Sequence, residues 1–113
     1  MVNPILQFNG QQVATTKDGF LVNPSDWNET VAVALAGSVP ILLTEAHWEI
    51  IRYIRDYYQK FRHLPNNRMF VKGVSLMLGE TKGNSIYLNA LFAGSPVRFA
   101  CLVAGLPKPP GCF

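Results

Sequence analysis

Residues 44–62 read Thr-Glu-Ala-His-Trp-Glu-Ile-Ile-Arg-Tyr-Ile-Arg-Asp-Tyr-Tyr-Gln-Lys-Phe-Arg. The large apolar side chains recur at spacings of three and four residues, which is the period of one face of an α-helix. They are Trp48, Ile51, Ile54, Tyr58 and Phe61. Thr44 is a preferred N-cap residue, and Arg52 and Asp56 have the i, i+4 spacing of a helical ion pair. The stretch therefore predicts one long amphipathic helix over residues 45–62.

Four shorter helices are predicted on either side of this one. The first starts at the capping residues 23–26 and ends before Gly37 and Pro40. Apolar patterns with caps predict the other three over residues 67–78, 86–92 and 96–104. Helix therefore dominates the chain from residue 25 to residue 104.

Residues 1–22 have the pattern of short strands instead. Apolar and polar residues alternate over 5–8, and Asn9-Gly10 is a strong hairpin signal before a returning strand at 11–15. A second turn precedes a short third strand at 20–22.

These elements together predict the fold class and the organisation of the chain. We expect an α+β fold in which a small N-terminal antiparallel β-meander packs on a bundle of about five helices. The 113 residues form a single domain with a meander (1–22), a helical part (25–104) and an extended, mobile, proline-rich C-terminal arm (105–113).

Composition restricts the class of protein. The chain is 49% hydrophobic and 15% charged, which is typical of a compact soluble domain with a real core. No apolar run approaches the roughly 20 residues that span a bilayer, and the N-terminus lacks the pattern of a signal peptide. We therefore expect a cytoplasmic protein without membrane insertion. The two cysteines and two histidines match no usual zinc spacing, so neither a metal nor a cofactor is expected.

The C-terminal arm holds the first candidate for chemistry. Gly105 ends the preceding helix, and three prolines at 107, 109 and 110 then prevent helix formation. An extended chain from Gly105 to Cys112 spans roughly 20 Å at about 3.1 Å per residue. The sequence thus predicts an arm that carries the nucleophilic thiol of Cys112 into a cleft on another protein.

Cys101 is the second candidate, at the end of the last predicted helix. Taken alone, a cysteine in an apolar helix is most often a small buried hydrophobic residue. Because Gly105 and Gly111 allow the arm to fold back, Cys101 is also a candidate redox partner of Cys112. Both interpretations remain open from the residues alone.

Charge is distributed unevenly along the chain. Residues 1–49 contain one lysine against five acidic residues, whereas residues 50–113 contain nine lysines and arginines against two. This basic half predicts docking to an acidic protein or to RNA, although a solvated helix face explains it nearly as well. The candidate docking residues are Arg55, Arg68, Arg98 and Lys108.

Other functional classes have weaker support. The predicted helices 67–78 and 84–92, joined across Gly79, have the outline of a helix-turn-helix, so a nucleic-acid-binding regulator is a distant alternative. The chain contains no Ser/His/Asp arrangement, phosphate-binding glycine loop or carboxylate pair at catalytic spacing. A conventional hydrolase or nucleotide-using enzyme is not expected.

Several segments resemble one known family over nearly the whole chain. They are Asp18-Gly-Phe-Leu21, Trp27, Leu43-Thr-Glu-Ala-His-Trp-Glu-Ile-Ile51, Ile54-Arg-Asp-Tyr-Tyr58, Lys82-Gly-Asn-Ser-Ile-Tyr-Leu88 and, most specifically, Ala104-Gly-Leu-Pro-Lys-Pro-Pro-Gly-Cys-Phe113. The chain resembles the DsrC/TusE family of sulfur-relay proteins, which includes the gamma subunit of dissimilatory sulfite reductase. Cys101, eleven residues before Cys112, resembles the second cysteine of the DsrC type.

The resemblance implies a sulfur carrier rather than a conventional turnover enzyme. Cys112 would hold sulfane sulfur as a persulfide, and Cys101 would resolve it through an intramolecular disulfide or trisulfide. The implied donor is a DsrEFH- or TusBCD-like protein. The implied acceptor is dissimilatory sulfite reductase or, alternatively, an enzyme that makes 2-thiouridine in tRNA, without direct nucleic-acid binding by this chain.

The chain departs from familiar members at two places where a partner would dock. These are Leu64-Pro-Asn-Asn-Arg-Met-Phe70, with the apolar Gly73-Val-Ser-Leu-Met-Leu78 after it, and Phe92-Ala-Gly-Ser-Pro-Val97. The departures put the partner's identity in question and leave the expected chemistry unchanged.

Overall fold

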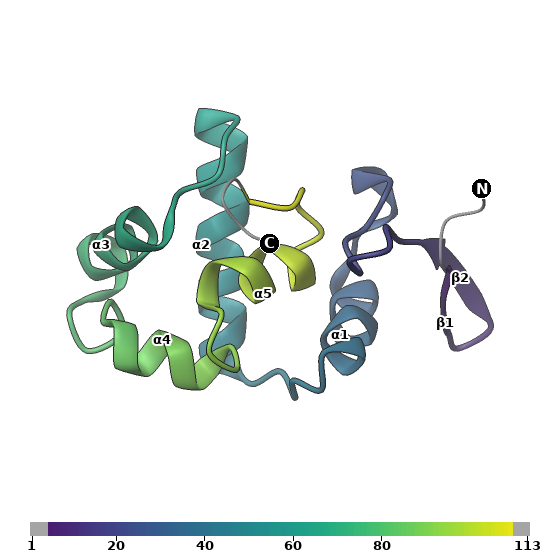
Figure 1. The fold of residues 1–113 in the computed structure, drawn as a ribbon, viewed down its shortest axis with the longest axis horizontal. Helices are drawn as coiled ribbons and strands as arrows, with labels where there is room; N and C mark the ends of the chain where they lie inside the picture. The colour runs from purple at the N-terminus through teal and green to yellow at the C-terminus, as the bar shows by residue number, and fades with distance from the viewer. Residues whose placement is uncertain (1–4, 110–113) are drawn as a thin grey trace.

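A computed structural model describes residues 5–109 and has the α+β fold that the sequence predicts (Figure 1). A two-stranded hairpin is followed by a short 3-10 turn and five helices. The elements are β1 (Ile5–Phe8), β2 (Gln11–Ala14), η1 (Pro24–Asp26), α1 (Glu29–Ser38), α2 (Glu45–Phe61), α3 (Asn67–Leu78), α4 (Ser85–Leu91) and α5 (Pro96–Val103). The hairpin lies at one end of the molecule beside α1, and α3 and α4 lie at the other end.

The hairpin is confirmed, whereas the third strand of the meander is wrong. β1 and β2 pair antiparallel with Ile5 opposite Ala14, and Asn9 and Gly10 make the turn with φ of 45° and 76°. Residues 20–22 contribute only one bridge, between Thr15 and Leu21. Phe20 and Leu21 instead turn their side chains into the core, where they are 1% and 5% exposed, so this segment does not continue along the sheet.

The first helix begins later than the sequence predicted. Asn23 caps only the 3-10 turn η1, where its Oδ1 accepts from the Ser25 amide at 3.1 Å. Asn28 caps α1, because its Oδ1 accepts from the Val31 amide at 2.9 Å. Between the two caps Trp27 lies in extended backbone, which leaves its side chain available for a contact with α5.

The long helix α2 forms as predicted and is anchored at its start by His47. The Nδ1 atom of His47 accepts from the Thr44 amide at 3.0 Å, closing a capping box. This assigns the ring proton to Nε2, which donates to the Leu91 carbonyl of α4 at 2.7 Å. The predicted Arg52–Asp56 pair is wrong, because Arg52 reaches back to Glu45 at 2.7 Å.

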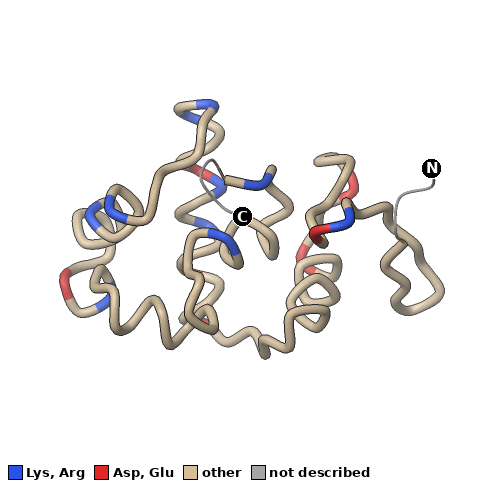
Figure 2. The backbone as a smooth tube through the Cα atoms, viewed as in Figure 1, with Lys and Arg blue, Asp and Glu red and all other residues tan. Residues whose placement is uncertain are grey.

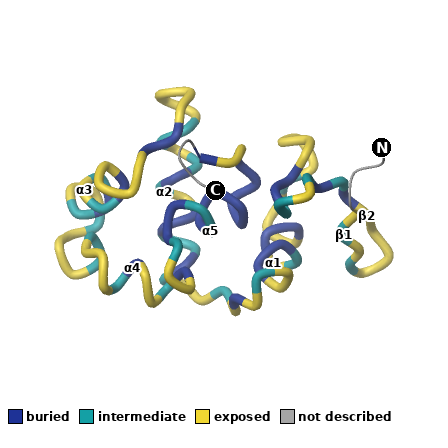
Figure 3. Tube along the Cα trace, in the orientation of Figure 1, coloured by how far each residue is buried: buried dark blue, intermediate teal, exposed yellow. Residues whose placement is uncertain are grey.

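Helices α3, α4 and α5 are confirmed, and α5 lies at the centre of the molecule. It packs against α1, α2, α3 and α4, and six of its eight residues are buried (Figure 3). Its N-cap is Ser95, and Pro96 occupies the first turn, where a missing amide hydrogen costs nothing. The helix that carries Cys101 is therefore the core helix, surrounded by the other elements.

Between residues 5 and 109 no single helix is long and apolar enough to cross a membrane. Within this range only α4 and α5 taken together, with a bend of 46° between them, have the required length and apolarity.

Candidate functional site

The two candidate cysteines differ in what the structure describes. Cys112 lies outside the described residues. Cys101 lies in the last turn of α5, and its side chain is fully buried. The site is therefore built from the base of the arm, the residues that connect α5 to the segment carrying Cys112.

The arm leaves α5 through a tight helix-ending turn. Gly105 adopts a left-handed φ of 72°, its amide donates to the Leu102 carbonyl at 3.3 Å, and the Leu106 amide donates to the Cys101 carbonyl at 3.0 Å. These two bonds define a Schellman motif. The motif turns the chain sharply at Gly105 and connects Leu106 of the arm directly to the backbone of Cys101.

Two side chains from elsewhere hold the remaining carbonyls at the end of α5. The Trp27 indole Nε1 donates to the Val103 carbonyl at 2.9 Å, and Arg55 Nη1 donates to the Ala104 carbonyl at 2.6 Å. A helix C-terminus has four carbonyls without helical partners, and all four are satisfied here. The base of the arm is therefore fixed from both sides, by the linker before α1 and by α2.

Trp27 and Arg55 also contact each other. The Arg55 guanidinium lies over the Trp27 ring, 3.8 Å from its centroid, which is a cation–π arrangement. Burial lowers the pKa of Arg55, and the neighbouring Asp56 carboxylate partly offsets that effect. Arg55 was predicted as a docking residue, but its observed contacts are internal and position the arm.

Gly105 has a second requirement besides its backbone angle. A β-carbon at this position would lie 2.3 Å from Cδ1 of Trp27, far inside van der Waals contact. The indole therefore closes directly over the backbone where the arm begins, and no residue with a side chain fits without displacing it.

The described part of the arm lies against the body of the protein. Residues 106–109 have neither helix nor strand, as the prolines predict. Leu106 is 6% exposed and Pro109 is buried, while Lys108 Nζ lies 3.3 Å from Asp18 Oδ2. A hollow of about 430 Å³ lies beside this segment, lined in part by Thr16, Asp18, Gly105 and Pro107. The turn at 16–19 thus supports the arm from the meander side.

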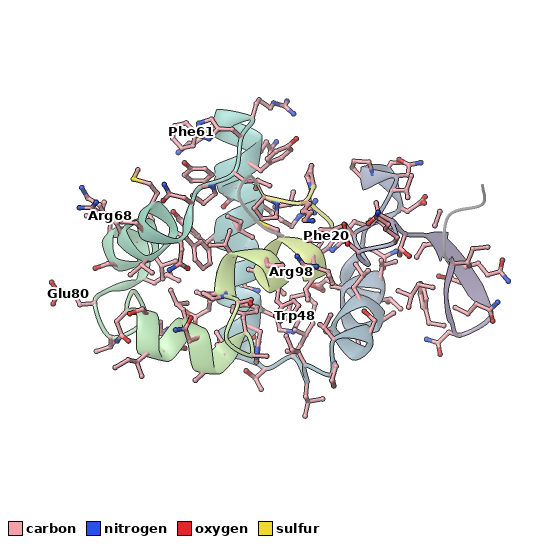
Figure 4. All side chains as sticks on the ribbon, viewed as in Figure 1. Phe20, Trp48, Phe61, Arg68, Glu80 and Arg98 are labelled. Atoms are coloured by element: carbon pink, nitrogen blue, oxygen red, sulfur yellow. The ribbon has the colours of Figure 1, made fainter. Side chains whose placement is uncertain are left out.

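The four predicted docking residues do not form one surface. Arg55 and Lys108 lie at the arm base, and the Arg98 guanidinium on α5 lies over Phe20, 5.7 Å from the ring centroid (Figure 4). Arg68 lies on α3, well away from the arm. The basic positions lie on several separate segments of the chain (Figure 2).

The structure does not add support for a helix-turn-helix that binds nucleic acid. The helix that would enter a DNA groove is α4, which is seven residues long and has the sequence Ser-Ile-Tyr-Leu-Asn-Ala-Leu. It carries no lysine or arginine to contact phosphate, and contacts of that kind supply nearly all of the sequence-independent affinity for nucleic acid.

The roles of Trp27, Asp18 and His47 were missed from the residues alone. Each makes its functional contact with a segment 44 to 90 residues away. The local sequence pattern indicates helix caps and helix faces, but it does not indicate contacts between residues so far apart in the sequence. The available signal was a tryptophan soon after Pro24, because the indole N–H of a buried tryptophan usually has a hydrogen-bond acceptor.

The family was established by comparison with known proteins. The family model described as "DsrC like protein" matches residues 7–113. The chain belongs to the DsrC-like family. The match includes both cysteines and the whole arm, so the predicted family is confirmed.

Relatives cover nearly the full chain. Sulfurtransferase TusE of Photorhabdus laumondii is 48% identical over 96% of this chain and 98% of its own, and the TusE homolog of Haemophilus influenzae is 47% identical over 96% and 100%. Among solved structures, Allochromatium vinosum DsrC superposes with a TM-score of 0.87 at 42% identity, covering both chains completely. The oxidized gamma subunit of dissimilatory sulfite reductase from Archaeoglobus fulgidus gives 0.83 at 43%, covering 97% of this chain and all of its own.

Proposed function

We propose that this DsrC-like protein is a sulfur carrier that performs the TusE step of a relay leading to 2-thiouridine in tRNA. The relatives at 42–48% identity named Sulfurtransferase TusE support this assignment over the sulfite reductase role that the sequence favoured. The observation that carries the proposal is the fixed base of the arm. Trp27, Arg55 and the Gly105 turn give a proline-stiffened segment a defined point of departure.

In the loading step, sulfur passes between two cysteines without net oxidation. The Cys112 thiolate attacks the terminal sulfur of a persulfide on the donor protein, a new S–S bond forms, and the donor's S–S bond breaks. The donor leaves as a thiolate, and Cys112 becomes the persulfide. Delivery is the same reaction with Cys112 as the donor. A thiolate of the acceptor attacks the terminal sulfur of the Cys112 persulfide and takes it, and Cys112 leaves as a thiolate.

Cys101 supplies a second way to discharge Cys112. Its thiolate attacks the Cys112 sulfur, the Cys101–Cys112 disulfide forms, and the terminal sulfur leaves as hydrosulfide. The two cysteines are oxidised and the sulfane sulfur is reduced, so the step balances. Since the Cys101 side chain is fully buried and its carbonyl accepts a hydrogen bond from the Leu106 amide, this step requires α5 to open locally.

The proposed partners are two proteins, a TusBCD-like donor and a tRNA-thiolating acceptor enzyme. The protein acts as a co-substrate that is loaded and unloaded, and we place it in the cytoplasm.

The second candidate function is that of a sulfur carrier that works with dissimilatory sulfite reductase. Cys101 favours it, because the resemblance associates a second cysteine at this spacing with the DsrC type. The structures with TM-scores of 0.83 and 0.87 are likewise named as DsrC or the sulfite reductase gamma subunit.

A reconstituted relay distinguishes the two candidates. A TusBCD-type donor carrying labelled sulfane sulfur is mixed with this protein, the tRNA-thiolating enzyme and unmodified tRNA. We expect label in tRNA that depends on this protein and disappears with Cys112→Ala but persists with Cys101→Ala. No label in tRNA, combined with sulfur transfer in the presence of sulfite reductase, would assign the second function instead.

A further inference from the structure

A long groove separates α2 from α3, away from the arm. Its volume is about 660 Å³. Tyr53, Tyr57 and Phe61 of α2 form one wall, and Leu76, Met77 and Leu78 of α3 form the other.

The groove exposes large apolar side chains to solvent. Phe61, Leu76 and Met77 are 55%, 77% and 70% exposed. Soluble proteins rarely leave such residues adjacent and uncovered, and contiguous patches of this kind mark interaction sites. Leu76 and Met77 also belong to the apolar segment 73–78.

The two walls of the groove are fixed relative to each other by direct contacts between them. The Tyr53 hydroxyl occupies the space where a β-carbon on Gly73 would lie, and its ring packs 6.2 Å from that of Phe70. Lys82 binds both carboxylate oxygens of Glu49 at 2.7 Å, which ties the loop after α3 to α2. The groove is therefore preformed, which lowers the entropy lost on binding.

Exposed cations lie on α3 and at the end of α2, and one of them, Lys60, lines the groove itself (Figure 2). Lys60, Arg62, Arg68 and Lys72 are exposed, and none forms an ion pair with another residue in the 5–109 range. Of the two carboxylates that line the groove, Glu49 is neutralised by Lys82, and Asp56 lies beside Arg55. The surface therefore complements an acidic partner.

The groove and the hollow at the base of the arm share one lining residue. Asp56 lines the groove and also lines the hollow of about 390 Å³ formed by Arg55, Arg62, Gly105 and neighbouring residues. Because Arg55 and Arg62 project from the face of α2 opposite to Tyr53, a partner that receives the arm reaches the groove only by extending around this helix.

We propose that this groove docks an amphipathic segment of a relay partner, with apolar residues seated against Leu76 and Met77 and acidic residues facing Lys60 and Arg68. The inference rests on the proposed function and adds to it a second contact besides the arm. Sulfur transfer would then require two engagements, one at the thiol and one at the groove, which raises the effective concentration of the arm at its target.

Two other occupants fit the groove less well. RNA would need open aromatic faces, but the rings of Tyr57 and Phe61 pack on each other at 4.8 Å and the wall formed by α3 contributes no aromatic residue. A second copy in a two-fold dimer would bring the same cations together, with Asp56 as the one groove carboxylate outside an ion pair among residues 5–109 to match them.

The test measures loading kinetics from a TusBCD-type donor complex and delivery to the tRNA-thiolating enzyme. Leu76→Asp in the groove is compared with Ile86→Asp on α4, which alters a side chain that is 83% exposed and lies outside the groove. We expect Leu76→Asp to raise the half-saturating partner concentration about tenfold or more, in at least one of the two steps, with Ile86→Asp unchanged. Lys60→Glu combined with Arg68→Glu should weaken the same step and reduce its salt dependence.

Loading by glutathione persulfide separates the docking proposal from the carrier function on which it rests. Wild type and Leu76→Asp should load Cys112 equally from this small donor, which shows that the variant is folded and that the thiol is competent. If Leu76→Asp leaves the half-saturating partner concentration unchanged in both loading and delivery, the groove is not a docking site. The carrier function would remain intact. A groove-dependent dimer in light scattering, or binding of tRNA alone that Leu76→Asp abolishes, would also overturn the docking proposal. Failure of wild type to load from any donor would remove the proposed function itself.

Discussion

Arg55 of α2 donates a 2.6 Å hydrogen bond to the carbonyl of Ala104, 49 residues later, at the point where the C-terminal arm begins. The same guanidinium stacks on Trp27, whose indole holds the preceding carbonyl, that of Val103. One arginine therefore links the long helix, the linker before α1 and the end of the core helix. The arm departs from a fixed position even though its own sequence is short and rich in proline.

Removing the Arg55 guanidinium should destabilise the protein and slow sulfur transfer to a partner. Arg55→Met keeps the aliphatic stem but leaves the Ala104 carbonyl without its donor, at a cost of about 1–3 kcal/mol in the free energy of unfolding. Urea titration measures this cost. Arg55→Lys keeps the charge but not the planar stack on Trp27, so we expect an intermediate loss. If Arg55→Met has the same free energy of unfolding as wild type, the role assigned to this hydrogen bond is contradicted.

Gly105→Ala should be far more damaging than the same change at another glycine with positive φ. Gly10 has a similar φ of 76° and open space around it, so Gly10→Ala reports the backbone cost alone, about 1 kcal/mol. Gly105→Ala adds a β-carbon that would lie 2.3 Å from the Trp27 ring. We expect a larger drop in melting temperature for Gly105→Ala, together with a change in tryptophan fluorescence. Equal effects at both glycines would show that Trp27 does not close over the arm.

The Asp18–Lys108 pair should affect the arm more than the stability of the fold. The two side chains are about one third exposed, so their ion pair contributes less than about 1 kcal/mol. Asp18→Asn should therefore leave the free energy of unfolding nearly unchanged and speed amide hydrogen exchange at Lys108. Raising the salt concentration should have the same effect on wild type but not on the variant. Identical exchange in both proteins would show that the pair does not hold the arm.

Stability should fall at alkaline pH as the Lys82–Glu49 pair is lost. The hydrogen bond from Lys82 to Glu49 raises the pKa of Lys82, so the folded state holds this proton more tightly than the unfolded state does. The contribution is complete below the ordinary lysine pKa, about 10.4, and disappears as pH rises through the higher folded-state value. Lys82→Met should flatten this part of the stability–pH curve. Burial also raises the pKa of Tyr53 and acts in the same direction, so a residual slope is expected to remain.

Cys101 should react slowly with thiol reagents in the native protein. Its side chain is fully buried at the centre of the molecule, so modification requires opening of α5. In Cys112→Ala we expect slow modification that urea accelerates strongly. Immediate modification of the native variant would show that the Cys101 thiol is accessible without such opening.

Local pattern was sufficient to predict most of the helices. α2 carries apolar residues at regular helical spacing, and α3 and α5 end at glycines that the sequence marks as stops. The first helix was misplaced because two capping asparagines, Asn23 and Asn28, lie five residues apart, and the earlier one caps only a 3-10 turn. The third strand failed because Phe20 gains more by burial in the core than by pairing in an edge strand.

The site was predictable only in part. The arm, the turn at Gly105 and both cysteines were visible in the sequence, since prolines, glycines and thiols are informative by residue type. The hydrogen bonds from Trp27 and Arg55 were not, because they join residues 49 to 76 positions apart, and such pairings depend on the tertiary fold. The Arg55 side chain was predicted to dock a partner, whereas its observed partners are Trp27 and Ala104.

The sulfur-carrying role of Cys112 is tested most directly by intact mass spectrometry after incubation with a TusBCD-type persulfide donor. Wild type and Cys101→Ala should both gain the mass of one sulfur atom, and subsequent addition of the acceptor enzyme should remove it. Cys112→Ala should gain nothing. A sulfur adduct of equal yield on Cys112→Ala, or no adduct on wild type, would contradict the assignment of Cys112 as the carrier.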